Sequence, residues 1–180
     1  MRRRAKRPSN RTNRISSRTR VRSRSLHLQT LEDRCVLSAI SLLSDGQVTV
    51  NADDQDNNIV AWVNEDTDTL VIKVDQTQLE FPNSQVRHIN IFGNGGNDVI
   101  GIRDSVGQTT TLNGGRGNDR IVGSNQRDLI IGGGGDDELS GRDGADRIDG
   151  GVGNDAIRGG AGNDAIQGGK KQKIAFQALW

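Results

Sequence analysis

The sequence has few of the side chains that usually build a core. Its 180 residues include two Trp, three Phe and no Tyr, so few side chains can bury a large apolar area. The single cysteine, Cys35, excludes an intramolecular disulfide. A domain with so thin a core needs another source of stability, which leaves bound metal or oligomerisation.

The sequence also has few histidines and no long apolar run. Its two histidines are His27, in the basic N-terminal segment, and His88, predicted to be a packed or surface histidine. No Ser-His-Asp triad and no His-rich zinc site is therefore expected. No apolar stretch approaches the roughly 18 residues that span a bilayer, so no transmembrane segment is predicted.

Charge divides the chain into two parts. Residues 1–34 carry a net charge of +10 and residues 35–180 a net charge of −9, so the two parts must have different roles. Residues 1–44 are predicted to be a disordered basic leader that carries an export signal. A nucleic-acid-binding arm is the alternative, although neither an aromatic platform nor a known nucleic-acid module accompanies the arginines.

The leader contains the segment Leu31-Glu32-Asp33-Arg34-Cys35-Val36-Leu37-Ser38-Ala39. It resembles the LEPRxLL sorting motif of secreted and surface proteins of planctomycete bacteria, which it matches at Leu31, Glu32, Arg34 and Leu37. The resemblance implies a secreted or cell-surface location. The charged residues before Cys35 make lipid attachment improbable, so this cysteine is interpreted as incidental.

Residues 45–112 are predicted to form a β-rich N-terminal region that caps the Gly-rich C-terminal part of the chain. Short Val-, Ile- and Thr-rich runs are separated by polar turns, and residues 59–63 and 70–74 are expected to pair as a hairpin. Asp53, Asp54 and Asp56 lie close together without the glycine spacing of a metal loop, so a solvated turn is expected there.

A nine-residue repeat begins at Gly114 and runs through six units to Gln167. Each unit consists of a six-residue Gly-rich turn that ends in Asp and a three-residue strand whose central residue is Ile or Leu. An outlying unit, residues 93–101, supplies Asp98, but Asp98 precedes Asp119 by 21 residues and is out of phase. Two strands back to back enclose an aliphatic core, so two units should make one coil and residues 18 apart should stack.

The chemistry of these turns suits a hard cation. Glycine permits positive φ angles and brings backbone carbonyls close to a common point. Ca²⁺ takes six to eight oxygen ligands, which carbonyl groups and Asp carboxylates can supply. A flexible Gly/Asp linker would need no fixed phase, and a metal-free solenoid would leave stacked aspartates to repel one another.

The pattern G-G-x-G-x-D-x-U-x resembles that of the RTX, or haemolysin-type, calcium-binding repeats. The resemblance implies an all-β fold whose residues 113–169 form a parallel β-roll, with Ca²⁺ bound between adjacent coils by loop carbonyls and two aspartates. On one side Asp137 should pair with both Asp119 and Asp155, and on the other Asp146 with both Asp128 and Asp164. The predicted metal-binding residues are Asp119, Asp128, Asp137, Asp146, Asp155, Asp164, Gly115, Gly117, Gly133, Gly135, Gly151, Gly153, Gly160 and Gly162.

Three substitutions interrupt the motif. Ser124 and Gln126 replace motif glycines in the second unit, which puts the site between Asp128 and Asp146 in doubt, and Arg142 is a milder change in the fourth unit. Residues 170–180 are expected to be an irregular tail. The resemblance implies that residues 174–180 serve as a C-terminal export signal or as an apolar cap, and a truncated or frame-shifted end is the alternative.

The leading functional hypothesis is calcium binding that folds a secreted or surface structural module, without enzymatic activity or a nucleic-acid partner. The alternative is a fragment or accessory module of a secreted RTX enzyme or toxin. Any catalytic site would then be built from carboxylates in residues 45–112. Adhesion to a cell surface or matrix, with the roll as a spacer, is a third hypothesis.

Overall fold

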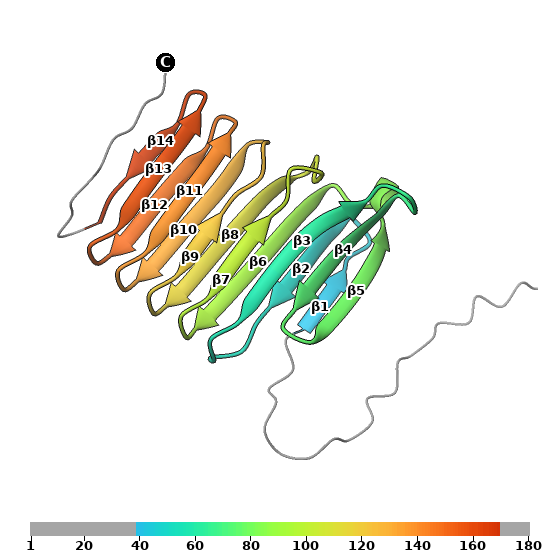
Figure 1. Ribbon diagram of the computed structural model, residues 1–180, viewed down its shortest axis with the longest axis horizontal. Coiled ribbons are helices and arrows are strands. Elements are labelled where there is room, and N and C mark those ends of the chain that lie inside the picture. Colours follow the sequence, from blue (N-terminus) through green and yellow to red (C-terminus); the bar gives the residue numbers. More distant parts are fainter. Residues whose placement is uncertain (1–38, 170–180) are drawn as a thin grey trace, which may run out of the picture. The chain divides into compact units, whose positions relative to one another are not determined.

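The computed structural model describes residues 39–169, which fold into two stacked β-sheets (Figure 1). The first sheet contains, in spatial order, β1 (Ala39–Leu42), β2 (Gln47–Asn51), β6 (His88–Gly95), β8 (Thr109–Arg116), β10 (Asp128–Gly134), β12 (Arg147–Val152) and β14 (Ala165–Gln167). The second contains β13 (Ala156–Ala161), β11 (Glu138–Asp143), β9 (Arg120–Val122), β7 (Val99–Ile102), β3 (Asn58–Asn64), β4 (Thr69–Val74) and β5 (Thr77–Pro82). A single 3₁₀ turn, Asn83–Gln85, completes the elements of this part, and the all-β prediction is confirmed.

The repeat block winds as a parallel β-roll, as predicted. Successive strands alternate between the two sheets, so each coil uses one strand from each. In the first sheet Ile130 pairs with Ile148, which pairs in turn with Ile166. In the second sheet Leu139 pairs with Ile157 in the same way. The 18-residue period of the sequence is therefore the period of one coil.

The core between the two sheets is a thin aliphatic layer. Every second side chain of a strand points inward, as the two-residue period of a β-strand requires. The repeat contributes one Ile or Leu to each strand. Between Ile121 and Ile157 each of these side chains is at most 2 % exposed, whereas Ile166 in the last coil is only partly buried. Among residues 39–169, every fully buried hydrophobic side chain of this core is aliphatic, which agrees with the scarcity of aromatic residues in the sequence.

Residues 39–102 continue both sheets of the roll. β2 pairs in parallel with β6, and β3 with β7, so the same coil geometry precedes the repeats. β3 and β4 form the predicted antiparallel hairpin, with Val63 opposite Leu70, and β5 adds a third, exposed strand. The hairpin prediction is confirmed.

Asp98 is out of phase in the sequence but in register in the structure. Ile100 and Leu112 are 12 residues apart, whereas Ile121 and Ile130 are 9 apart. The three extra residues lie in the loop between β7 and β8, so β7 still pairs with β9 and Ile100 lies opposite Ile121. A loop can lengthen at little energetic cost, which is why the insertion leaves the ladder intact.

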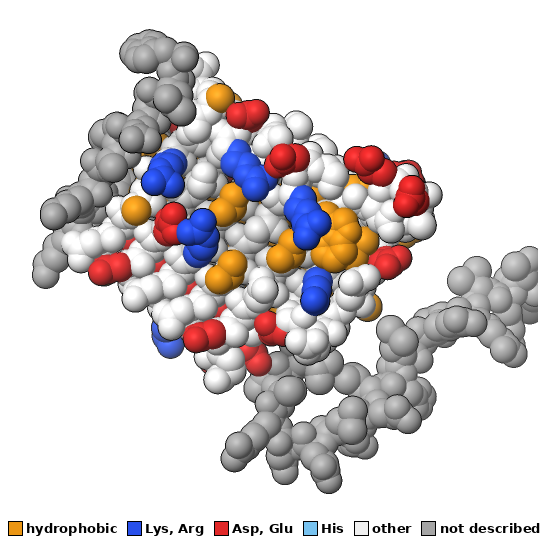
Figure 2. All heavy atoms as spheres, viewed as in Figure 1, with side chains coloured by type: hydrophobic (Ala, Val, Ile, Leu, Met, Phe, Trp, Pro, Cys, Tyr) orange, Lys and Arg blue, Asp and Glu red, His pale blue; other side chains and the backbone are white. Residues whose placement is uncertain are grey.

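The outer face of the second sheet carries basic and apolar side chains together (Figure 2). Arg103 lies over the ring of Trp62, 5.2 Å from its centroid, and Arg120 pairs with Glu138 on the next coil.

In the stretch from 39 to 169 no helix is long and apolar enough to cross a membrane. The predictions for most of the leader, for Cys35 and for the tail lie outside the described residues.

Candidate metal centre

Two ladders of side chains run along opposite edges of the roll, one residue per coil. The first ladder lies in the turns that lead from the first sheet to the second, and the other ladder lies in the turns that lead back. The first ladder comprises Asn57, Asp98, Asp119, Asp137 and Asp155. The second ladder comprises Thr110, Asp128, Asp146 and Asp164.

A backbone hydrogen bond joins each residue of a ladder to the next. The N–H of Asp119 donates to Oδ1 of Asp137 at 2.8 Å, and that of Asp137 donates to Oδ1 of Asp155 at 3.1 Å. In the second ladder the N–H of Asp146 donates to Oδ1 of Asp164 at 3.0 Å. The structure thus brings together every pair of aspartates, 18 residues apart, that the repeat predicts.

The other carboxylate oxygen is buried without a partner in four of these aspartates. Among the described residues, Oδ2 of Asp98, Asp119, Asp137 and Asp146 accepts no hydrogen bond, and each of these side chains is at most 2 % exposed. Burial raises the pKa of Asp98 and Asp137 to about 7, and neighbouring carboxylates add to the effect. A buried carboxylate with a free oxygen needs either a proton or a cation.

Backbone carbonyls crowd the same turns. Gly132 has no side chain, and two oxygens approach the space where a Cβ would stand. One is Oδ2 of Asp137, and the other is the carbonyl oxygen of Gly150 in the next coil, 2.6 Å from that position. At Gly135 the carbonyl oxygen of Gly117, in the preceding coil, likewise occupies the space where a Cβ would stand. No three His, Cys, Asp or Glu side chains cluster within residues 39–169, so carbonyl oxygens must supply much of any metal shell. This donor set fits Ca²⁺.

The predicted glycines occupy the positions where the backbone requires them. All eight have φ angles between +89° and +149°, which side chains rarely adopt. They are Gly115, Gly117, Gly133, Gly135, Gly151, Gly153, Gly160 and Gly162. Asn94 and Arg142 adopt positive φ at equivalent places, with φ of 73° and 76°.

Ser124 changes the chemistry of the second unit. It is fully buried, and its N–H donates to Oδ2 of Asp128 at 2.6 Å while its hydroxyl lies 3.0 Å from both carboxylate oxygens. Thr110 donates to Oδ1 through its N–H and its hydroxyl. Asp128 is thus satisfied by protein donors, in contrast to the four aspartates with a free oxygen.

Replacing Ser124 should remove a hydrogen-bond donor from the Asp128 carboxylate and leave this carboxylate more dependent on a bound calcium ion. We expect Ser124→Gly to lower the stability of the calcium-free protein by about 1–3 kcal/mol, because a buried carboxylate loses its hydroxyl donor. The difference in melting temperature between Ca²⁺ and EGTA should widen. Thermal unfolding in both conditions measures this, with Ser84→Gly at an exposed position as the control. An unchanged difference would mean that Ser124 is only a packing residue.

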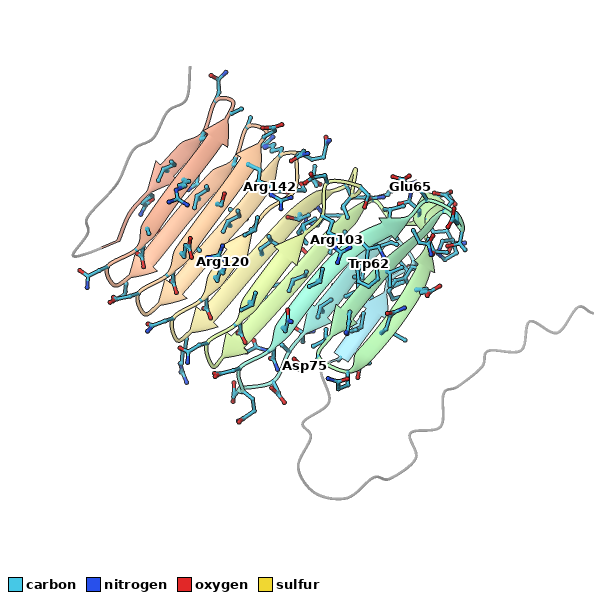
Figure 3. All side chains as sticks on the ribbon, in the orientation of Figure 1. Trp62, Glu65, Asp75, Arg103, Arg120 and Arg142 are labelled. Carbon is cyan, nitrogen blue, oxygen red and sulfur yellow. The ribbon has the colours of Figure 1, made fainter. Side chains whose placement is uncertain are left out.

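Arg142 shows why a non-glycine residue is tolerated in the fourth unit. Its guanidinium donates to the carbonyl oxygen of Ile102 at 2.9 Å and to the carboxylate of Asp104, both near the loop that carries the insertion. Arg142 lies near this loop, on the same edge of the roll (Figure 3). The interaction joins residues about 40 apart in the chain and compensates for the unfavourable φ angle.

Sequence reasoning missed Asp98, Asn57 and Thr110 as ladder members. The Gly-rich turn at residues 93–98 was a visible signal for Asp98, but the 21-residue spacing concealed its register. Nothing in the sequence marked Asn57 or Thr110, because neither residue belongs to a motif turn. Their places follow from strand pairing alone.

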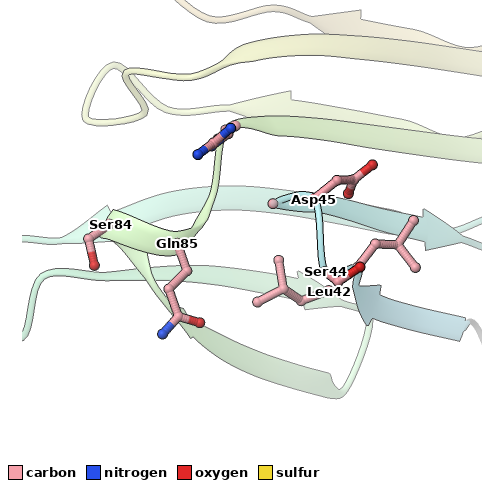
Figure 4. Close-up of a pocket in the computed structure, with 8 residues that line it drawn as sticks. Leu42, Ser44, Asp45, Ser84 and Gln85 are labelled. Carbon is pink, nitrogen blue, oxygen red and sulfur yellow. The ribbon is translucent and has the colours of Figure 1, made fainter.

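Two further features of residues 39–169 lie outside the ladders. The ring nitrogens of His88 lie 2.8 and 3.0 Å from the hydroxyls of Thr109 and Thr111, which makes it a packed surface histidine. A hollow at the N-terminal end is lined by residues 42–46 and by residues 84, 85 and 87 (Figure 4). Its one carboxylate, Asp45, accepts hydrogen bonds from the backbone and the side chain of Gln47.

Comparison with protein families agrees with the geometry. A family model described as the RTX calcium-binding nonapeptide repeat matches residues 109–139 and 140–170. No curated protein and no solved structure is significantly similar to the chain. Repeats of this family bind Ca²⁺, and the matched residues are those that form the regular part of the β-roll. Residues 109–170 therefore carry RTX-type calcium-binding repeats, and the repeat block folds as a parallel β-roll.

Proposed function

We propose that this protein is a secreted or surface structural module whose β-roll folds when Ca²⁺ binds. The observation that carries the proposal is the set of buried, unpartnered carboxylate oxygens on the two ladders, which face carbonyl oxygens of the next coil. Without a cation, each added coil brings another buried carboxylate close to the last. With a cation between coils, the same oxygens become ligands and attract the coils together.

The proposed sites lie between successive aspartates of a ladder. Asp137 contributes to two of them, one with Asp119 and one with Asp155, and Asp146 shares a third with Asp164. The glycines that line these turns would contribute carbonyl oxygens. The fourth site expected from the repeat, between Asp128 and Asp146, should be the weakest, because Ser124 already hydrogen-bonds to Asp128.

Calcium concentration would then control where the protein folds. A ligand that binds only the folded state stabilises that state by mass action, and extracellular calcium modules commonly bind at about 10⁻⁴ to 10⁻³ M. Where Ca²⁺ is scarce, the roll would be only marginally stable and largely unfolded at growth temperature, and it would become rigid outside the cell. The export leader expected over residues 1–44 would end before Ala39, because Ala39–Leu42 form β1 and pair with β2 in the first sheet.

We also propose that residues 45–112 cap the N-terminal end of the roll. The hairpin formed by β3 and β4 buries Leu70, Ile72 and Val74 in the common core, and β5 then covers the edge of β4. A solenoid needs such a cap because its terminal coil otherwise exposes apolar surface.

A calcium titration followed by far-UV circular dichroism tests the proposed function. At a temperature above its melting temperature in EGTA, the wild-type chain should change from coil to β-structure near millimolar Ca²⁺, and a variant without four ladder carboxylates should lose this transition. The four changes are Asp137→Ala, Asp146→Ala, Asp155→Ala and Asp164→Ala. A control lacks three exposed acids, through Glu65→Ala, Asp66→Ala and Glu80→Ala, and should behave like the wild type. Identical spectra at every calcium level for all three proteins would contradict the proposal.

A further inference from the structure

The turn formed by residues 52–57 lies at the beginning of the first ladder, outside the residues that match the repeat family. It has no motif glycine, and the sequence suggests a solvated turn. In the structure its last residue, Asn57, is only 5 % exposed and stands where the other turns have aspartate. The N–H of Asn57 donates to Oδ1 of Asp98 at 2.8 Å, the same hydrogen bond that joins the aspartates of the repeat.

Two carboxylates determine which way the Asn57 amide points. Its Nδ2 donates to Oδ1 of Asp53 at 3.0 Å and to Oδ2 of Asp75 at 3.2 Å. Ionised carboxylates only accept hydrogen bonds, so they must face the amide nitrogen and not the amide oxygen. Asp75 lies at the same edge of the roll as the turns of the first ladder (Figure 3).

The amide oxygen of Asn57 is consequently directed inward. Within residues 39–169 it is buried and has no hydrogen-bond partner. The neighbouring ladder residue, Asp98, is 1 % exposed, and its Oδ2 is also buried without a partner. Two adjacent ladder residues therefore each present an unpartnered oxygen, and neither a backbone N–H nor a side-chain donor of the described chain meets them.

The surroundings of these oxygens are strongly negative. The carboxylates of Asp119, Asp56 and Asp53 all lie close enough to Asp98 to act on its charge. Asp56 itself accepts a hydrogen bond from the N–H of Asn97 at 2.6 Å, which ties the turn at residues 52–57 to the turn at residues 93–98. Unpartnered oxygens in a dry, negative site favour a hard divalent cation.

We propose that the turns at residues 52–57 and 93–98 hold a further Ca²⁺ ion, with the Asn57 amide oxygen and the Asp98 carboxylate as its side-chain ligands. Asp53 and Asp75 are positioning residues, because they hold the amide nitrogen away from the ion. The inference rests on the proposed function, since the ion continues the same ladder. Calcium would then bind the N-terminal region to the roll as well as joining the repeats.

Counting bound ions on the full-length protein tests this site. Equilibrium dialysis with radioactive Ca²⁺ should show one bound ion fewer for Asn57→Ala than for the wild type. Asn58→Ala, at the exposed neighbouring position, should bind as many ions as the wild type. Asn57→Asp, which creates a ladder aspartate, should keep the ion and should melt lower than the wild type in EGTA. Its melting temperature should rise more on adding Ca²⁺, because the new carboxylate is repelled without the ion and attracted by it.

The outcomes separate this site from the repeat sites. If the wild type binds Ca²⁺ but Asn57→Ala binds the same number of ions, the Asn57 site is wrong and the proposed function stands. If the wild type binds no Ca²⁺, both are wrong. Should Asn57→Ala fail to fold, Asn57→Asp decides, because a rise in melting temperature with Ca²⁺ no larger than that of the wild type would overturn the site.

Discussion

Changing Gly135→Ala should lower the melting temperature of the calcium-loaded protein by roughly 10 °C or more, whereas Gly134→Ala should change it by only a few degrees. The two glycines are neighbours in the same turn, so the comparison holds the local sequence constant. Gly135 has a φ angle of +136°, and a Cβ there would collide with the carbonyl oxygen of Gly117 in the preceding coil. An added Cβ on Gly134 meets no atom within 4 Å.

The size of the effect follows from backbone strain and from close stacking. A side chain at such a φ angle costs up to about 3 kcal/mol, and the collision with the carbonyl adds to this cost. Moving the carbonyl away would also separate the coils where Ca²⁺ is proposed to bind. Gly135→Ala should therefore reduce calcium affinity as well as stability.

Thermal unfolding monitored by circular dichroism at a fixed, saturating Ca²⁺ concentration measures the difference, and Gly153→Ala should reproduce it. At Gly153 a Cβ would meet the carbonyl oxygen of Gly135, again at positive φ. Equal melting temperatures for Gly134→Ala and Gly135→Ala would show that the coils are not stacked as closely as the structure indicates.

Without calcium, the protein should lose stability as the pH rises from about 4 to about 7. Burial, with help from neighbouring carboxylates, raises the pKa of Asp98 and Asp137 to about 7 and that of Asp146 to about 6. In this interval the folded chain holds protons that the unfolded chain has released, because an unfolded Asp has a pKa of about 3.9. Stability therefore falls with increasing pH, by linkage.

Saturating calcium should flatten this dependence, because protons and Ca²⁺ compete for the same carboxylates and the calcium-loaded chain holds no extra protons. The apparent dissociation constant of Ca²⁺ for the folded protein should rise as the pH falls from 7 to 5. Urea unfolding at several pH values, in EGTA and in Ca²⁺, gives both dependences. A calcium-free protein with stability independent of pH between 4 and 7 would show that the ladder carboxylates are not desolvated.

The variant Asp137→Asn supplies the matched test. Its amide oxygen can still accept the N–H of Asp119, while no charge is buried. In EGTA at pH 8 it should be more stable than the wild type, and its stability should depend less on pH. In Ca²⁺ it should be the less stable of the two, since a site ligand has lost its charge.

The sequence by itself was enough to predict the β-roll and the main partners in it. Strands of a parallel roll pair in register, so a strict nine-residue period places residues 18 apart next to each other. Asp137 lies beside Asp119 and Asp155 for this reason, and Ile148 beside Ile130. The glycine positions were predictable likewise, because a turn that must place carbonyls against the next coil leaves no room for Cβ.

Only the tertiary structure decided which other residues join the ladders and which aspartates remain unsatisfied. Asp98 enters the first ladder because a loop absorbs the extra residues, and sequence spacing does not reveal where an insertion is absorbed. Ser124 satisfies Asp128 through the local turn conformation, and Asn57 receives its orientation from Asp53 and Asp75, the latter 18 residues away beyond the β3–β4 hairpin. Such hydrogen bonds depend on the position and orientation of individual side chains. The period of a sequence repeat predicts only which backbone segments stack on each other.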